Sequence, residues 1–281
     1  MRLIGCLLGL LICLSALHMC LTAPEGTAVP KTYPMTAEAV MDRAEVIVEL
    51  CRQVRYITHA AGTVDGMTGS NSREAMEAAC GAGCRFVELD FNFTADGELA
   101  CVHDWYTQYS SAITDNVPLT AAEFRECRIY DTYTPMLLED AAAFLLQYDD
   151  LYIVTDIKDD NLAGLAHIAS RYPELRHRFI AQIYHEDEYD AVWEMGFENI
   201  IYTLYRLDWA GKTDTDHLRE LAGEKLLFGY TFAADLCSLD GYVEEMLTCG
   251  VPLYIHTVNG DTEQDGYFAM GISGIYTDEQ K

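Results

Sequence analysis

Short apolar runs alternate with longer segments of helical spacing over most of the chain after residue 50. The apolar runs predict eight strands, at 54–58, 86–90, 151–156, 179–183, 200–204, 226–230, 252–257 and 274–277. The segments between them carry apolar residues three and four positions apart, which predicts helices at 71–82, 135–148, 162–172, 186–195, 214–222, 239–249 and 263–270. Alternating strands and helices of this number predict a (β/α)₈ TIM barrel, with an open doubly wound sheet as the alternative.

A β-hairpin insertion is expected after the second strand. Glu88 and Asp90 are two residues apart in an extended run, so their side chains share one face. Asp96-Gly97 is typical of a two-residue hairpin turn, which would return the chain as an antiparallel strand over 98–103. The register set by that turn would place Asp90 opposite His103.

Two carboxylates and an imidazole on one patch are unfavourable unless something binds between them. At about 4 Å and an effective dielectric constant of about 20, two like charges repel by roughly 4 kcal/mol. A divalent cation would make this arrangement favourable, whereas the alternative interpretation is an ordinary solvated strand face.

Polar residues also recur where the other predicted strands end. In a barrel, the carboxyl ends of all strands meet at one face, where catalytic groups are found. Residues expected at that face are His59, Glu88, Asp90, Asp156, Lys158, Gln182, Tyr184, Thr257, Asn259 and Asp278.

The chain is strongly acidic. Its 45 Asp and Glu residues outnumber 18 Lys and Arg residues, which gives a formal net charge of -27. Such a charge repels nucleic acid and anionic membrane surfaces, so we expect no nucleic-acid partner. A phosphate ligand would need a metal ion to supply much of the positive charge.

The first residues predict export from the cytoplasm. Arg2 precedes an almost unbroken apolar run over 3–21, which is typical of a signal peptide cleaved after Ala23 or of an uncleaved membrane anchor. A lipid anchor on Cys20 is a further option. We therefore expect 1–23 to be a signal peptide or anchor, 24–50 a linker and N-terminal helix, and 51–281 the barrel, in a secreted or membrane-anchored protein.

Seven cysteines follow the apolar leader. Their odd number leaves at least one unpaired, and the paired C-x-x-C spacing of a zinc site is absent. We expect most of them to be buried apolar residues, with one disulfide as an option.

Taken together, these segments resemble the glycerophosphodiester phosphodiesterase family. The resemblance runs from about Tyr56 to Asp278. Its blocks are His59-Ala60-Ala61-Gly62, Asn71-Ser72-Arg73-Glu74-Ala75, Val87-Glu88-Leu89-Asp90, Thr94-Ala95-Asp96-Gly97, Val102-His103-Asp104, Asp156-Ile157-Lys158, Thr257-Val258-Asn259 and Gly274-Ile275-Tyr276-Thr277-Asp278.

The resemblance implies a metal-dependent phosphodiesterase that hydrolyses small glycerophosphodiesters. It implies metal ligation by Glu88, Asp90 and Asp156, for which Ca²⁺ or Mg²⁺ suits the all-oxygen donor set. It further implies that His59 and His103 act as general base and general acid, and that Lys158 stabilises charge on the phosphoryl group.

Three positions depart from the family pattern. The usual H-R-G is His59-Ala60-Ala61-Gly62 and lacks its arginine, the usual glutamate at 156 is an aspartate, and Asn71 lacks the preceding glutamate. These departures leave two alternatives open, namely phospholipase C- or D-like action on phospholipid and a non-catalytic binding barrel.

Overall fold

The computed structural model describes residues 46–47, 49–106, 109–114 and 116–281. They belong to one unit, Met41–Lys281. The expected signal peptide or anchor, the linker and most of the N-terminal helix therefore lie outside the described residues, and those predictions stay predictions. No helix within the described ranges is long and apolar enough to cross a bilayer.

Eight parallel strands close into a barrel. Their order is β1-β9-β8-β7-β6-β5-β4-β2, and pairing of β1 with β2 completes the ring. This closure confirms the TIM barrel and rejects the open sheet. The strands are β1 (Tyr56–Thr58), β2 (Phe86–Phe93), β4 (Tyr152–Ile157), β5 (Phe179–Ile183), β6 (Asn199–Thr203), β7 (Gly229–Ala233), β8 (Leu253–His256) and β9 (Gly274–Thr277).

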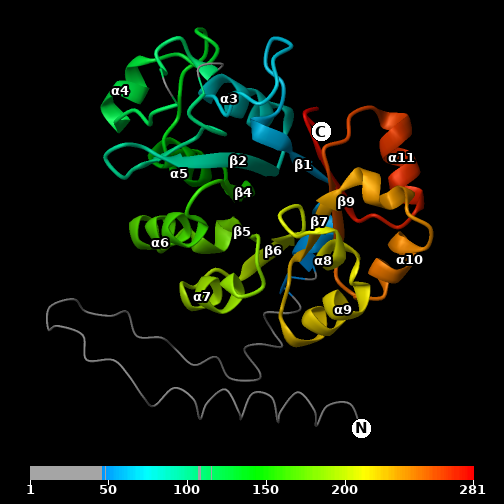
Figure 1. Cartoon of the computed structure of the whole chain (residues 1–281). Helices are drawn as coiled ribbons and strands as arrows, with labels where there is room; N and C mark the ends of the chain where they lie inside the picture. The colour runs from blue at the N-terminus through cyan, green and yellow to red at the C-terminus, as the bar shows by residue number, and fades with distance from the viewer. Residues whose placement is uncertain (1–45, 48, 107–108, 115) are drawn as a thin grey trace, which may run out of the picture. The chain divides into compact units, whose positions relative to one another are not determined.

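Helices surround the ring of strands (Figure 1). Their buried faces and the outward faces of the strands form the largest apolar cluster. The helices are α3 (Arg73–Ala82), α4 (Ala121–Glu126), α5 (Leu138–Gln147), α6 (Asn161–Arg171), α7 (Glu188–Glu194), α8 (Trp209–Thr213), α9 (Thr215–Glu224), α10 (Tyr242–Leu247) and α11 (Asp261–Ala269), with 3₁₀ turns η1 (His59–Ala61), η3 (Arg176–Arg178) and η4 (Ala234–Ser238).

A second apolar cluster fills the interior of the barrel at the amino ends of the strands, which we call the floor. Helical residues at 46–47 and 49–53 cover this end, where Ile47 and Leu50 are buried. The strands contribute Ile57, Phe86, Val154, Ile180, Ile201, Tyr254 and Tyr276, and Phe228 joins them from the position just before β7. The floor is therefore closed and apolar, and the opposite end remains for polar groups.

The hairpin is present, but its predicted register is wrong. β3 (Leu99–Ala100) pairs antiparallel with β2, with Asn92 opposite Ala100 and Phe93 opposite Leu99. The loop is one residue longer than expected, because Thr94 pairs with Glu98 and leaves three residues, the last being Gly97 at a left-handed φ of 85°. Pairing then ends, so Asp90 and His103 are not cross-strand partners.

The rest of the insertion has a small apolar core of its own. Trp105 and Phe124 pack edge to face there, 5.4 Å between ring centroids, with Ile113 and Ile129 in the same cluster. Helix α4 begins at a capping box between Thr120 and Glu123. This order inside the insertion, like helix α8, was not predicted from periodicity.

All seven cysteines that follow the leader are free thiols. Six are buried and Cys80 is half-buried, which confirms that most of them act as small apolar residues and leaves no disulfide among the described residues.

Candidate active site

A cavity of about 270 Å³ opens at the carboxyl ends of the strands. It brings together five of the six predicted site residues, and Asp90 lies beside them. The lining residues are His59, Glu88, His103, Asp156, Lys158, Gln182, Thr203, Tyr205, Thr231, His256, Thr257 and Tyr276.

Three carboxylates form a cluster on neighbouring strands. Asp90 on β2 pairs in register with Asp156 on β4, and Glu88 lies two residues before Asp90 on the same face. One oxygen of each carboxylate lies within 4.8 Å of the others. Burial raises the pKa of Glu88 to about 8, and the charge of Asp90 adds to this effect. Crowding of buried carboxylates is unfavourable unless a cation is present.

Neighbouring polar groups hold two of these carboxylates in position. Asn71 donates its side-chain amide to Asp90 over 2.9 Å and accepts the Asp90 backbone N–H over 3.0 Å. The Tyr184 hydroxyl donates to the other side of the cluster, at Asp156. Ser72 caps α3, whereas the side chain of the preceding Asn71 bonds to the cluster.

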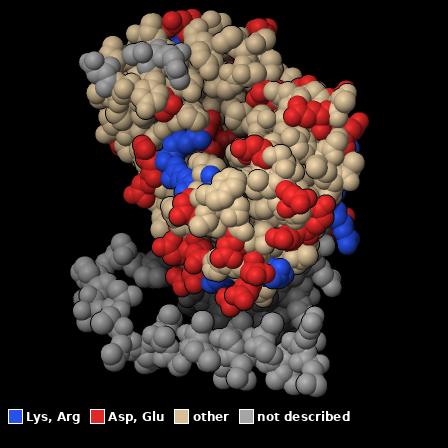
Figure 2. All heavy atoms as spheres, turned by 45° about the vertical axis from the view of Figure 1, so that its right-hand side comes forward, with Lys and Arg blue, Asp and Glu red and all other residues tan. Residues whose placement is uncertain are grey.

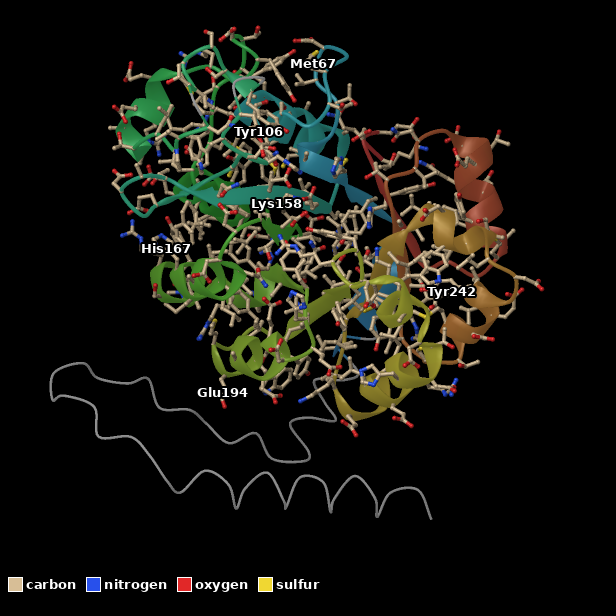
Figure 3. The ribbon with its side chains drawn as sticks, viewed as in Figure 1. Met67, Tyr106, Lys158, His167, Glu194 and Tyr242 are labelled. Atoms are coloured by element: carbon tan, nitrogen blue, oxygen red, sulfur yellow. The ribbon has the colours of Figure 1, made fainter. Side chains whose placement is uncertain are left out.

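Lys158 follows β4 and places its ammonium against the cluster. Nζ lies 2.6 Å from Asp156 and 3.0 Å from Asp90. Burial lowers the pKa of Lys158, but the charges of Asp90, Asp156 and Glu88 outweigh it and the net shift is upward. Figure 3 shows Lys158 inside the ring of helices that carries His167, Glu194 and Tyr242.

His59 follows β1 directly and is held by a partner that follows the last strand, β9. Its Nδ1 lies 2.8 Å from Oδ1 of Asp278, and Asn259 donates to the other oxygen of that carboxylate over 2.8 Å. Burial lowers the pKa of His59, but Asp278, Glu88 and Asp90 together raise it to about 9. The Nε2 atom therefore remains to contact a ligand in the cavity.

An unusual turn follows His59. Ala60, Ala61 and Gly62 have left-handed φ angles of 46°, 64° and 83°. A Cβ atom at Gly62 would lie 2.8 Å from the Thr58 side chain, so only glycine fits there. The turn aims the Ala60 N–H at Glu88, 2.7 Å away. The segment that departs from the family's H-R-G therefore still contacts the carboxylate cluster.

His103 reaches the same cavity by a different route from the one predicted. Asn92 on β2 donates to the His103 carbonyl over 3.1 Å, which places the residue beside the strand although ladder pairing has ended. Its Nδ1 lies 2.7 Å from Asp104, and its side chain is 46% exposed. Both histidines thus have a carboxylate at Nδ1 and a free Nε2.

Several lining residues were missed from the sequence. His256 is not among the residues expected at this face, yet it lines the cavity with its ring edge-on to Tyr205 and Tyr276. Burial lowers the pKa of His256 to about 4, so the ring is neutral. The period-two alternation could have found it, because His256 lies two residues after Tyr254, which faces the barrel interior.

A divalent cation fits the carboxylate cluster by its donor chemistry. The donors are all oxygens, and the fully buried Oδ1 of Asp90 accepts no hydrogen bond and has only the ion-pair contact with Lys158 at 3.0 Å. Hard cations such as Ca²⁺ and Mg²⁺ prefer such donors. A larger hollow of about 390 Å³ lies between the insertion and α6, but it contains none of these residues.

The model of the glycerophosphoryl diester phosphodiesterase family matches residues 59–281. The chain belongs to this family. Membership places it among the phosphoric diester hydrolases, as the sequence blocks implied. A comparison with curated proteins finds no match.

Solved structures of other glycerophosphodiester phosphodiesterases share the fold. One from Parabacteroides distasonis is 18% identical, with a TM-score of 0.64, and the match covers 80% of this chain and 92% of that one. One from Thermotoga maritima is 19% identical, with a TM-score of 0.63 and coverage of 81% and 96%. An Oleispira antarctica phosphodiesterase in complex with the product sn-glycerol-3-phosphate is 16% identical, with a TM-score of 0.61 and coverage of 80% and 92%.

Proposed function

We propose that this protein hydrolyses glycerophosphodiesters to glycerol phosphate and an alcohol. The observation that carries the proposal is the meeting of the three-carboxylate cluster with two histidines in one cavity. The Oleispira antarctica enzyme of the same fold was solved with sn-glycerol-3-phosphate, which supports a substrate of this class.

In this proposal, His59 and His103 transfer the protons. Each imidazole is oriented by a carboxylate at Nδ1, so Nε2 faces the reacting atoms. One histidine removes a proton from the attacking hydroxyl, and the other donates a proton to the leaving alcohol oxygen. The carboxylates of Asp278 and Asp104 stabilise the imidazolium form of their partners.

Glu88, Asp90 and Asp156 would hold a divalent cation, Ca²⁺ or Mg²⁺. Such an ion polarises phosphoryl oxygens when bound. Lys158, whose ammonium touches two of the carboxylates, is placed to stabilise negative charge that develops on the phosphoryl group.

Release of glycerol phosphate from glycerophosphocholine tests the proposal. The chain without residues 1–23 would be assayed with Ca²⁺, with Mg²⁺ and with chelator. We expect metal-dependent turnover that falls at least about a hundredfold in His59→Ala and in His103→Ala, because general acid–base catalysis contributes at that scale. His177→Ala is the matched control, since His177 lies in η3 outside the cavity.

Other outcomes of this assay distinguish the alternatives. Cleavage of the phosphodiester of lysophosphatidylcholine in preference to that of glycerophosphocholine would replace our proposal with phospholipase C- or D-like action. A folded protein that binds metal but cleaves no diester in a broad panel would support the binding barrel that the missing arginine suggested.

We further propose that the protein acts outside the cytoplasm, either secreted or anchored by 1–23. The apolar run at 3–21 supports this location. Mass spectrometry of the protein from its native host tests it, because cleavage after Ala23 gives a mature chain that begins at Pro24, whereas an anchor leaves the protein full-length in the membrane fraction.

A further inference from the structure

The charges at the cavity do not balance for an anionic substrate. Among the lining residues, Lys158 is the Lys or Arg, and its ammonium already contacts Asp90 and Asp156. The imidazole of His59, whose pKa is raised, is paired in the same way with Asp278. Figure 2 shows that acidic side chains are widespread on the face it displays, whereas Lys and Arg form a few small groups. Beside the divalent cation that we propose for the carboxylates, a phosphodiester anion in this site would be stabilised by a side-chain cation whose charge is not already neutralised.

Arg206 is held at the rim of the cavity by three neighbours. It follows β6, and its guanidinium stacks on the Tyr184 ring at 3.9 Å from the centroid. Nη2 donates to the Lys158 carbonyl over 2.6 Å, and a side-chain hydrogen bond joins the guanidinium to Tyr205. Lys158 and Tyr205 both line the cavity. Arg206 is not itself a lining residue, but it connects the end of β6 with the end of β4 directly beside two residues that are.

The charge of Arg206 is available to a ligand. Its side chain is exposed, and none of the described carboxylates forms an ion pair with it. A guanidinium has five N–H donors in a planar fork, which suits the oxygens of a phosphate group. Stacking and hydrogen bonds that fix the fork before binding reduce the entropy lost on binding. By contrast, Arg125, Arg73 and Arg219 are paired with carboxylates.

We propose that Arg206 is a substrate-binding residue whose guanidinium contacts the phosphate group of the anionic ester in the cavity. This inference rests on the proposed function and adds to it the residue that supplies the missing positive charge. It also accounts for the turn at Ala60-Ala61, which carries no cationic side chain, because a cation from β6 can take its place at the rim.

Kinetics and direct binding together test the inference. The variants are Arg206→Met, which keeps the alkyl stem on Tyr184 but removes the charge, and Arg206→Lys, which keeps the charge but loses the fork. Arg219→Met is the matched control on α9. KM and kcat are measured with glycerophosphocholine, and the Kd of sn-glycerol 3-phosphate is measured by calorimetry in the presence of Ca²⁺ or Mg²⁺.

For Arg206→Met we expect KM and Kd to rise about tenfold or more, with kcat changed much less, because a charge-assisted hydrogen bond is lost in binding. The KM and Kd of Arg206→Lys should lie between those of Arg206→Met and of the unaltered protein. The KM and Kd of Arg219→Met should equal those of the unaltered protein. Unchanged KM and Kd in Arg206→Met would overturn the inference, as would a fall in thermal stability alone, which would show a purely structural role.

The two proposals fail separately in this design. If the unaltered protein cleaves no diester yet binds sn-glycerol 3-phosphate in an Arg206-dependent way, the proposed hydrolysis fails and the inference stands. If it cleaves the diester equally well with and without Arg206, the inference fails and the hydrolysis stands. If it neither cleaves the diester nor binds the phosphate ester, both are overturned.

Discussion

The two ends of the barrel interior differ in chemistry although the same strands build both. On β2, Phe86 lies in the apolar floor and Glu88 lines the cavity. On β6, Ile201 lies in the floor and Thr203 lines the cavity. We call the cavity end of the interior the mouth. Because interior-facing residues recur every second position, the floor residue and the mouth residue of each of these strands are only two positions apart.

Residues that stabilise the fold and residues expected to act in the reaction therefore lie very close together. The floor gains free energy from apolar burial, whereas the mouth holds buried carboxylates whose mutual repulsion costs free energy when no cation is bound. Substitutions at the mouth should therefore change activity more than stability, and substitutions at the floor should do the reverse.

The largest effect is expected at the mouth, from Glu88→Gln. Activity should fall at least about a hundredfold, because a metal ion that loses a ligand supplies less of the several kcal/mol it can contribute. The metal-free protein should be no less stable, since glutamine can still accept the Ala60 N–H and no longer repels Asp90. Thermal denaturation and kinetics check both halves. Full activity in this variant would show that Glu88 is not a ligand.

Ile201→Ala and Thr203→Ala compare floor and mouth on one strand. Ile201 is fully buried, so its truncation should lower the free energy of unfolding by about 2–5 kcal/mol. The Thr203 hydroxyl has no partner, so the cost there should be about 1 kcal/mol. Urea denaturation measures both values. Equal losses of stability at the two positions would contradict the division between the ends.

Asn71→Ala should lower the affinity of the site for a metal ion, because Asn71 holds Asp90 in position. Loss of a group that orients a ligand typically lowers metal affinity about 10- to 100-fold. Asn71 has a left-handed φ of 49°, so alanine also adds backbone strain of about 1 kcal/mol. Asn71→Gly removes the amide without that strain. Calorimetric metal titration should show the same loss of affinity in both variants, and normal affinity in Asn71→Gly would assign the effect to strain instead.

The smallest effect is expected at His217 on α9, away from both ends. A hydrogen bond to Glu186 raises the pKa of His217. The pair therefore stabilises the fold fully below the ordinary pKa of about 6.5, and the contribution is lost as pH rises through the raised value. Both side chains are 50% exposed, so solvent screening limits the effect to a few tenths of a kcal/mol.

Urea denaturation of His217→Gln at several pH values tests whether this stabilisation is lost as pH rises. The variant should be slightly less stable than the unaltered protein at about pH 5.5 and equal to it at about pH 9. A difference in the free energy of unfolding that increased with pH would show that the imidazole stabilises the fold in its neutral form.

The sequence predicted the barrel and the shared face of Glu88 and Asp90 because both depend on local periodicity, whereas Asp156 was assigned to the same cluster through the family resemblance. Strands 179–183 and 274–277 match their predicted bounds, whereas the strand predicted at 226–230 begins at Gly229. The apolar run there starts with Leu226 and Leu227, which pack before the strand begins, so apolar character alone misplaced it.

Features that depend on tertiary context escaped prediction. The hairpin register depended on one extra loop residue, Ala95, which an Asp-Gly pair does not reveal. His256 was missed because a histidine within an apolar strand is ordinarily a packing residue, although the period-two alternation from Tyr254 indicated an interior side chain. Arg206 was missed because its position depends on stacking with Tyr184, which follows β5 and is distant in sequence.

The contact between His59 and Asp278 has a consequence for how the protein is made. The two residues are 219 positions apart, so His59 leaves the ribosome long before its partner does. A nascent chain can form β1 and β2 and the carboxylate cluster of β2 and β4 while this imidazole is still unoriented. Hydrolytic competence should therefore appear all at once, when the last strand joins β1, and a chain that stalls before residue 278 should be inert even if most of it has folded.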